Sequence, residues 1–231
     1  MRAMSVKKGT PWSSWKHVTK LDPDKPITDQ QLRLIVDSGT DALMISGTQN
    51  ITNKNVARLI EKLHAFEIPK ILEPATPEAV LDDYVDFVFV PLVLNTGDLQ
   101  WIVGKHKDWI LNYAVNWDKV YAEAYIVLNP ESAVAQLTRA SSQLSAQEVV
   151  AYAQYAEHVL GIPIVYVEYS GKYGNPAVVQ AVDEVLTQTT LFYGGGISSR
   201  ESAEEMSRYA DVIVVGNIIY ENFDRYLETI P

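Results

Sequence analysis

Residues 162–195, IPIVYVEYSGKYGNPAVVQAVDEVLTQTTLFYGG, contain the unit from which the fold can be predicted. An apolar run (162–169) leads into a turn, a helical pattern follows, and a second apolar run (191–195) closes the unit. Pro176 suits the first turn of that helix, where its missing N–H costs nothing. Two continuously apolar runs joined by a helix are typical of parallel strands that are covered on both faces.

The same alternation extends along the whole chain of 231 residues, with Thr28 as an expected N-cap and a capping box in SAQE (145–148). Eight strands with crossovers predict one (β/α)8 barrel domain over residues 1–231, and an open doubly wound sheet is the alternative. The crossover between the third and fourth runs holds Pro74 and Pro77 and is short for a helix. The eight runs cover residues 17–21, 41–46, 69–73, 86–91, 123–129, 162–169, 191–195 and 211–216.

Composition excludes several classes of function. The net charge of −10 argues against nucleic-acid binding through a general basic surface. The absence of cysteine excludes disulfides and thiolate metal sites, and the four histidines show no zinc spacing. No apolar run approaches the roughly 20 residues of a membrane span, and the first nine residues do not resemble a signal peptide. We therefore expect a soluble, cytoplasmic protein.

Glycine-rich segments follow the last two predicted strands, where barrels commonly bind phosphate. GGGIS (194–198) and GN (216–217) each precede a helix, so their backbone N–H groups are accessible to an anion. The alternative is that Gly194–Gly196 only make a tight turn. Because both loops carry the signal in a predicted barrel, phosphate binding is the favoured interpretation.

Acidic residues also stand at predicted strand ends. Asp22 follows the first strand, and with Thr48 after the second it would suit Mg²⁺, which binds few protein ligands; alternatively, Asp22 caps the turn DPDK, and spacing does not separate the two readings. Glu168 ends an otherwise apolar run, and an unpaired buried carboxylate is costly. It could accept a proton from a substrate hydroxyl, or form a structural salt bridge with Lys20 or Lys172.

Several segments together resemble the geranylgeranylglyceryl phosphate synthase family, including its bacterial heptaprenylglyceryl phosphate synthase relatives. The resemblance is carried in order by residues 17–25, 37–50, 93–106, 125–135, 166–176, 191–201 and 212–221, and EYSGKYGNP with YGGGI and VGN is its most specific part. It implies a modified TIM barrel whose third helix is replaced by a short non-helical segment, a role that residues 73–86 would fill. The resemblance is closest to the archaeal branch that includes dimeric enzymes, so we expect a homodimer.

The resemblance also implies the reaction and its residues. The family transfers a prenyl group from a prenyl diphosphate to the C3 hydroxyl of sn-glycerol 1-phosphate, with Mg²⁺ held here by Asp22 and Thr48. Glu168 would be the base. The glycerol phosphate would be bound by Lys20, Tyr166, Glu168, Tyr169, Ser170, Gly171, Gly195, Gly196, Gly216 and Asn217.

An aromatic stretch (101–117) would wall the prenyl groove, with Trp101, Trp109 and Tyr113 as its lining. The spacing predicts that Lys105, Trp109 and Tyr113 share one helix face. By resemblance, a bulky residue at Trp109 limits the tail to C20, which implies geranylgeranyl diphosphate rather than a heptaprenyl diphosphate as the substrate. Without the resemblance, a core or interface tryptophan is the more common role.

Two other classes of function remain open from the residues alone. Another phosphate-handling barrel enzyme, such as an isomerase or an aldolase, is one; an aldolase would need Lys20 as its Schiff-base lysine. A non-catalytic phosphate-binding module is the other, because a fold alone does not fix a function.

Overall fold

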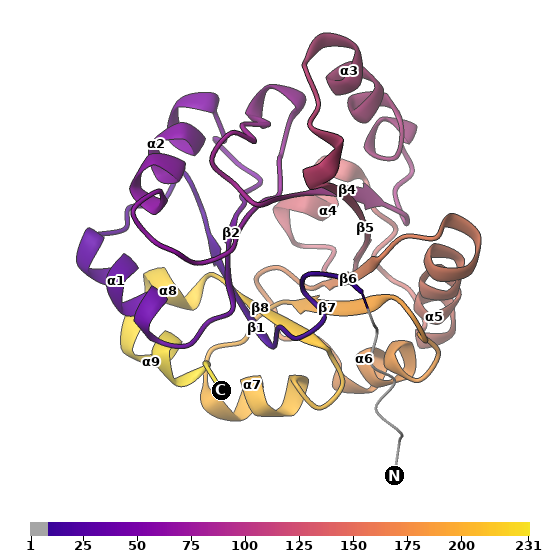
Figure 1. The fold of residues 1–231 in the computed structure, drawn as a ribbon. Coiled ribbons are helices and arrows are strands. Elements are labelled where there is room, and N and C mark those ends of the chain that lie inside the picture. The colour runs from indigo at the N-terminus through magenta and orange to yellow at the C-terminus, as the bar shows by residue number, and fades with distance from the viewer. Residues whose placement is uncertain (1–8) are drawn as a thin grey trace.

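Eight parallel strands close into a barrel in the computed structural model, which describes residues 9–231. The barrel is closed by pairing of the first and last strands, with Val18 opposite Val214, so the open-sheet alternative is wrong. Figure 1 shows the helices arranged around the strands. The strands are β1 (His17–Leu21), β2 (Ala42–Ile45), β3 (Lys70–Leu72), β4 (Phe87–Val93), β5 (Val120–Val127), β6 (Ile164–Glu168), β7 (Thr190–Gly194) and β8 (Val212–Val215).

The helices begin where the sequence carries capping residues. Thr28 and Ser145 each accept a hydrogen bond from the backbone N–H three residues on and form complete capping boxes, and Pro176 is the first residue of its helix. A five-residue π-helix (Ala156–Leu160) follows α5. The α-helices are α1 (Asp29–Asp37), α2 (Asn53–Leu63), α3 (Gly104–Asn112), α4 (Ala133–Thr138), α5 (Ala146–Tyr155), α6 (Pro176–Asp183), α7 (Arg200–Met206), α8 (Ile218–Glu221) and α9 (Phe223–Glu228).

The connection between β3 and β4 contains no α-helix, as predicted. A single 3-10 turn (Pro77–Ala79) lies there, and Pro77 opens it. Two more such turns, Leu99–Trp101 and Trp117–Lys119, flank α3 in the β4–β5 connection. The missing helix leaves apolar residues of this side of the barrel facing a groove, which is described below.

The N-terminal turn closes one end of the barrel, a role that the sequence did not suggest. Trp12 is fully buried and its ring lies 5.0 Å from Phe89 and 4.8 Å from Tyr121, both edge-on. In Figure 1 this indigo segment crosses the barrel end that faces the viewer. Such aromatic pairs stabilise a fold beyond the area they bury. Phe89 and Tyr121 lie near the first residues of β4 and β5, so the Trp12 cluster covers the end of the barrel where the strands begin. Most of the N-terminal extension 1–10, to which the sequence assigns no role, lies outside the described residues.

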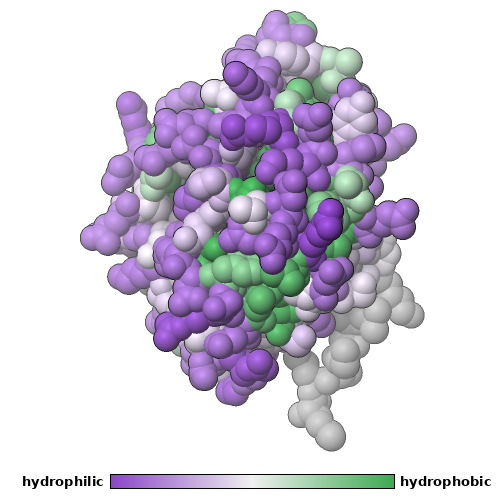
Figure 2. Space-filling view, turned by 90° about the vertical axis from the view of Figure 1, so that its left-hand side faces the viewer, coloured by the Kyte–Doolittle hydropathy of each residue, from purple (hydrophilic) through white to green (hydrophobic). Residues whose placement is uncertain are grey.

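The outer face over the helices is mostly hydrophilic, as Figure 2 shows by its purple colour, with a smaller hydrophobic area. This agrees with helices that bury one face against the strands. Within residues 9–231, no helix combines the length and the apolar character needed to cross a bilayer.

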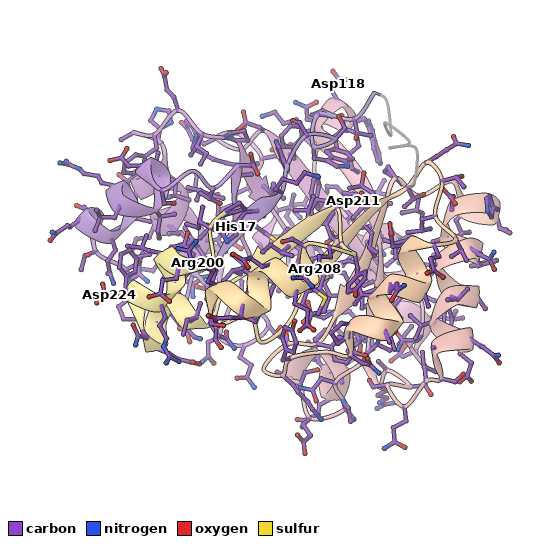
Figure 3. The ribbon with its side chains drawn as sticks, turned by 90° about the horizontal axis from the view of Figure 1, so that it is seen from below. His17, Asp118, Arg200, Arg208, Asp211 and Asp224 are labelled. Atoms are coloured by element: carbon purple, nitrogen blue, oxygen red, sulfur yellow. The ribbon has the colours of Figure 1, made fainter. Side chains whose placement is uncertain are left out.

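His17 on β1 is a buried histidine that should make stability depend on pH. Its Nδ1 lies 2.9 Å from Thr40 Oγ1, and Figure 3 shows it inside the molecule, whereas Asp224 is peripheral. Burial lowers the pKa of His17 from 6.5 to about 3. As pH falls, His17 of the unfolded chain is protonated before His17 of the folded protein. The contribution of neutral His17 to the free energy of unfolding is therefore complete above pH 6.5 and is lost as pH falls towards 3.

We expect His17→Gln to flatten that dependence by about 1.4 kcal/mol per pH unit within this window. Denaturant unfolding of both proteins at pH 4.5 to 7 measures the difference in slope. The exposed His64→Gln is the control. Equal slopes for wild type and His17→Gln would show that His17 is not the titrating group.

Candidate active site

A cavity of about 480 Å³ opens at the carboxyl ends of the strands, opposite the Trp12 end. Residues that follow β1, β2, β5, β6, β7 and β8 line it, which is the arrangement expected when strand ends converge in a barrel. Most of the predicted site residues meet here: Lys20, Asp22, Thr48, Tyr166, Glu168, Ser170, Gly171, Gly195, Gly196, Gly216 and Asn217.

The glycine loop after β7 lies directly against the loop after β6. Gly196 has a positive φ of 58°, and a Cβ there would meet the backbone N of Tyr173 at 2.2 Å. The Tyr193 hydroxyl joins the loops, accepting from Gly174 N and donating to Gly195 O, each at 2.8 Å. Glycine is therefore required by close packing, and the same loop presents bare backbone to the cavity, as an anion site needs. The predicted tight turn is therefore confirmed, and phosphate binding by this loop stays a prediction.

Glu168 is nearly fully buried, with 2% of its surface exposed, at the base of this cavity. Its Oε1 accepts from the Ser170 backbone N–H at 2.5 Å and its Oε2 lies 3.1 Å from the Tyr125 hydroxyl. Lys20 pairs instead with Glu73, at 3.1 Å, and no ion pair joins Glu168 to Lys20 or Lys172 within residues 9–231. The structural salt-bridge alternative is therefore wrong.

Burial raises the pKa of Glu168 above its ordinary value, although Lys20 and Ser170 oppose the shift. A carboxylate with a raised pKa is a stronger base than an exposed one, and this one faces the cavity. The position therefore suits proton abstraction from a bound hydroxyl.

Asp22 and Thr48 line the same cavity from neighbouring strand ends. Asp22 Oδ1 accepts from Asp24 N at 2.9 Å, so the predicted turn cap exists. A Cβ on Gly47 would lie 2.9 Å from that same oxygen, so the glycine keeps space open beside the carboxylate. Oxygen donors beside an open space fit a hard cation that keeps most of its waters. Residues 9–231 contain no cluster of three acidic or histidine side chains that would form a fuller cage.

An apolar groove runs outward from the polar cavity along the side that lacks a crossover helix. Its inner part, about 70 Å³, is lined by Pro74, Pro91, Val93 and Trp101 together with Glu168. Its outer part, about 40 Å³, continues past Trp101 to Val80 and Trp109. Trp109 is 5% exposed and lies on α3. Trp101 and Trp109, two of the three residues predicted to wall a prenyl groove, therefore line this apolar groove, with Trp109 in its outer part. That the groove holds a prenyl tail stays a prediction.

Comparison with known proteins identifies the family. The model of the PcrB family matches residues 10–231, nearly the whole chain. The chain belongs to the PcrB family.

Relatives within the PcrB family carry two names. A geranylgeranylglyceryl phosphate synthase of Methanocella arvoryzae is 55% identical, over 95% of this chain and 97% of its own. A heptaprenylglyceryl phosphate synthase of Geobacillus kaustophilus is 47% identical, over 94% and 91%. The geranylgeranylglyceryl phosphate synthase of Thermoplasma acidophilum, solved with sn-glycerol-1-phosphate, superimposes with a TM-score of 0.80 over 94% of this chain and 93% of its own, at 24% identity. That structure supports the modified barrel as the fold of this PcrB-family chain.

Two predicted residues lie elsewhere in this PcrB-family chain. Tyr113 is the residue after the last turn of α3, and its extended backbone (φ −132°, ψ 150°) takes it off the helix. The prediction that Tyr113 lines the groove with Trp109 is wrong, because α3 ends at Asn112 and Tyr113 lines a separate surface pocket, which it shares with Lys105. Tyr169 is not among the residues that line the cavity; its ring packs 6.2 Å from that of Tyr193, behind the glycine loop.

The sequence did not assign a buried polar network below the cavity. Glu73, directly after β3, accepts from Ser46 Oγ at 2.5 Å and from Lys20, and Tyr125 on β5 lies between Glu73 and Glu168. Glu123, two residues before Tyr125, is fully buried, and burial followed by the charge of Glu73 raises the pKa of its carboxyl well above the ordinary value. The position of Glu73 at a strand end was the one available signal.

Proposed function

We propose that this chain joins the geranylgeranyl group of geranylgeranyl diphosphate to the C3 hydroxyl of sn-glycerol 1-phosphate, forming the first ether bond of archaeal membrane lipids. The observation that carries the proposal is that the polar cavity and the apolar groove meet at Lys20, Thr48, Glu168 and Ser170, which line both. A small phosphorylated alcohol fits the first space and a prenyl tail fits the second. The names of the relatives support a prenyl group and a glycerol phosphate as the two parts of the product, and the geranylgeranyl name of the Methanocella arvoryzae relative supports the C20 tail.

The chemistry at that junction follows from Glu168. The C3 oxygen attacks C1 of the prenyl group, the new C–O bond forms, and the bond from C1 to the diphosphate oxygen breaks with its electron pair leaving on diphosphate. Glu168 accepts the C3 proton, which contributes typically about 10²–10⁴-fold. The glycine loops hold the glycerol phosphate, and the groove orients the tail so that C1 faces the hydroxyl.

Asp22 and Thr48 would hold Mg²⁺. When bound, the ion supplies charge neutralisation for the departing diphosphate. Lys20 adds a fixed positive charge to the same cavity. Burial alone would lower the pKa of Lys20, but the charges of Glu73 and Glu168 outweigh it and raise the pKa above its ordinary value.

A protonated lysine is a poor nucleophile, so this environment disfavours the Schiff-base chemistry of an aldolase. A non-catalytic module would need neither a buried carboxylate at the cavity base nor the groove that joins it. We further propose that the protein is a homodimer, and size-exclusion chromatography with light scattering would check its molar mass. We propose the cytoplasm as its location.

Mass spectrometry of the products tests the function. The protein is incubated with sn-glycerol 1-phosphate, Mg²⁺ and prenyl diphosphates of C20 and C35, with an EDTA-treated sample as the control. We expect the C20 ether and diphosphate, and little C35 product. Efficient formation of the C35 ether would assign the heptaprenyl reaction instead, and the absence of any ether would reject a prenyltransferase.

Trp109 should set the length of the tail, because it stands in the outer part of the groove and an indole cannot move aside cheaply. Trp109→Ala should raise the rate with C35 diphosphate by roughly tenfold or more, while the KM for glycerol phosphate is unchanged. Truncating a buried tryptophan costs about 3–5 kcal/mol, so the milder Trp109→Leu accompanies it.

The control is Trp117→Ala. Trp117 is 60% exposed, its ring lies 6.4 Å from that of Trp109, and it does not line the groove. Product masses from mixed C20 and C35 diphosphates give the ratio directly. A ratio that is unchanged in both Trp109 variants would show that the tail ends elsewhere.

A further inference from the structure

The hydroxyl of Tyr125 lies between two carboxylates. Its oxygen is 3.1 Å from Glu168 Oε2 and 3.1 Å from Glu73 Oε2. A phenol has one proton, so it can donate to only one of these oxygens at a time. If Glu73 and Glu168 are both ionised, the phenol donates to one of them, and its contact with the other places the phenol oxygen against a carboxylate oxygen with no proton between them. If one carboxylate carries a proton, both contacts become hydrogen bonds.

Glu73 is the member of this pair that stays ionised. Burial alone would raise the pKa of Glu73, but the charge of the Lys20 ammonium and the hydrogen bonds from the Ser46 hydroxyl and Lys20 hold that pKa below its ordinary value. The pKa of Glu168 is raised, chiefly by burial. The additional proton therefore belongs on Glu168, the group that faces the cavity.

We propose that the Tyr125 hydroxyl reverses its hydrogen bond when Glu168 takes up the substrate proton. Before the transfer, Tyr125 donates to the Glu168 carboxylate. After the transfer, the protonated Glu168 donates to the Tyr125 oxygen, and Tyr125 donates to Glu73. The only net transfer is from the C3 hydroxyl to Glu168, because the phenol keeps its own proton. Tyr125 and Glu73 are thus positioning residues for the base, and the inference rests on the proposed function of Glu168.

The reversal keeps Glu168 hydrogen-bonded in both protonation states. A buried polar group left without a partner costs about 1–3 kcal/mol, so a rigid donor would disfavour one of the two states. The protonated state has one more hydrogen bond than the ionised state, so Tyr125 increases the affinity of Glu168 for a proton. Lys20 Nζ also donates to the Tyr125 oxygen, at 3.3 Å, which leaves the phenol proton free to go to either carboxylate. The other titratable groups that act on this pair, or line its cavity, are Asp22, Lys25, Glu123, Glu131, Tyr166, Tyr193 and Tyr220.

Tyr125→Phe removes the hydroxyl and keeps the ring that stacks 4.5 Å from Tyr166. We expect kcat to fall roughly tenfold, a part of the about 10²–10⁴ that a general base supplies, with the KM for glycerol phosphate within about twofold. The acid limb of kcat should move to lower pH, because the additional hydrogen bond of the protonated state is lost. Tyr226→Phe, which deletes a buried hydroxyl 2.6 Å from Thr19, should leave that limb in place.

Carboxyl ¹³C NMR of glutamate-labelled protein tests whether Tyr125 couples Glu168 to Glu73, and it needs no enzymatic turnover. The variants Glu73→Gln and Glu168→Gln assign the two signals. We expect the Glu73 signal of the wild type to change at the pH where Glu168 titrates, and this response to vanish in Tyr125→Phe. A Glu73 signal that ignores Glu168 in the wild type, or that still follows it in Tyr125→Phe, would overturn the switch. Failure of the proposed function appears separately, as the absence of an ether product from the wild type.

Discussion

Glu168→Gln should lower kcat by roughly 10²–10⁴-fold, the contribution expected of a general base. Glutamine keeps the shape of the side chain and its bond with the Ser170 N–H, but its amide cannot accept a proton from the C3 hydroxyl. The loss should appear in kcat, because the base acts in the transition state, while the KM for prenyl diphosphate changes little. Steady-state rates at saturating concentrations of both substrates measure it.

The Glu168→Gln substitution should not lower thermal stability, although it lowers activity. Because the pKa of Glu168 is raised in the folded protein, ionising it disfavours folding, and stability falls as pH rises through that pKa. Neutral glutamine removes this cost, so the Tm of Glu168→Gln at neutral pH should equal or exceed that of the wild type. The activity of the wild type should fall as pH drops through the same pKa, because the base becomes protonated.

Glu157→Gln is the matched control for this experiment. Glu157 is also a buried carboxylate, but it accepts backbone N–H bonds from Thr187, Gln188 and Thr189, away from the cavity. Its replacement should lower the Tm and leave kcat unchanged. A Glu168 variant that behaved like Glu157→Gln, less stable but fully active, would return Glu168 to a structural role.

The barrel could be predicted from local patterns because each strand is a continuously apolar run and each crossover carries its own capping signals. Thr28 and Pro176 act within a few residues of themselves, so sequence alone places them. The absence of an α-helix from the connection after β3 could also be predicted, because two prolines and few residues leave no room for one.

The polar network was not predictable in the same way, since it depends on which side chains the barrel register brings together. Lys20 and Glu73 are 53 residues apart, and Tyr125 and Glu168 are 43 apart, so neither pair leaves a mark in the local pattern. Tyr113 shows the converse failure: helical spacing continued through it, but the helix had already ended. Trp12 closes the barrel through contacts with β4 and β5, which no feature of its own segment indicates.

Asp22→Asn should abolish most of the turnover and leave the fold intact. The asparagine side chain would keep an oxygen to accept the Asp24 N–H at the turn, so the cap survives, while the negative charge beside the open space at Gly47 is lost. A metal that stabilises a leaving group contributes several kcal/mol, and about 1.4 kcal/mol is tenfold in rate, so a loss of roughly 10³-fold is expected. Rates measured against Mg²⁺ concentration should also show saturation only at higher Mg²⁺.

Asp24→Asn provides the comparison within the same turn. Asp24 is exposed, accepts from Asn50 at 3.0 Å and does not line the cavity, so its neutralisation should leave both kcat and the Mg²⁺ requirement unchanged. Thermal unfolding and circular dichroism of both variants would separate a loss of charge from a loss of structure. If Asp22→Asn kept a near-normal rate with the same Mg²⁺ dependence, the carboxylate would be a turn cap alone and the cation would have to bind through the diphosphate and other oxygens. If instead the large loss is confined to Asp22→Asn, the charge at this strand end is what holds the metal, since each variant removes one carboxylate charge from the same turn and only Asp22 lines the cavity.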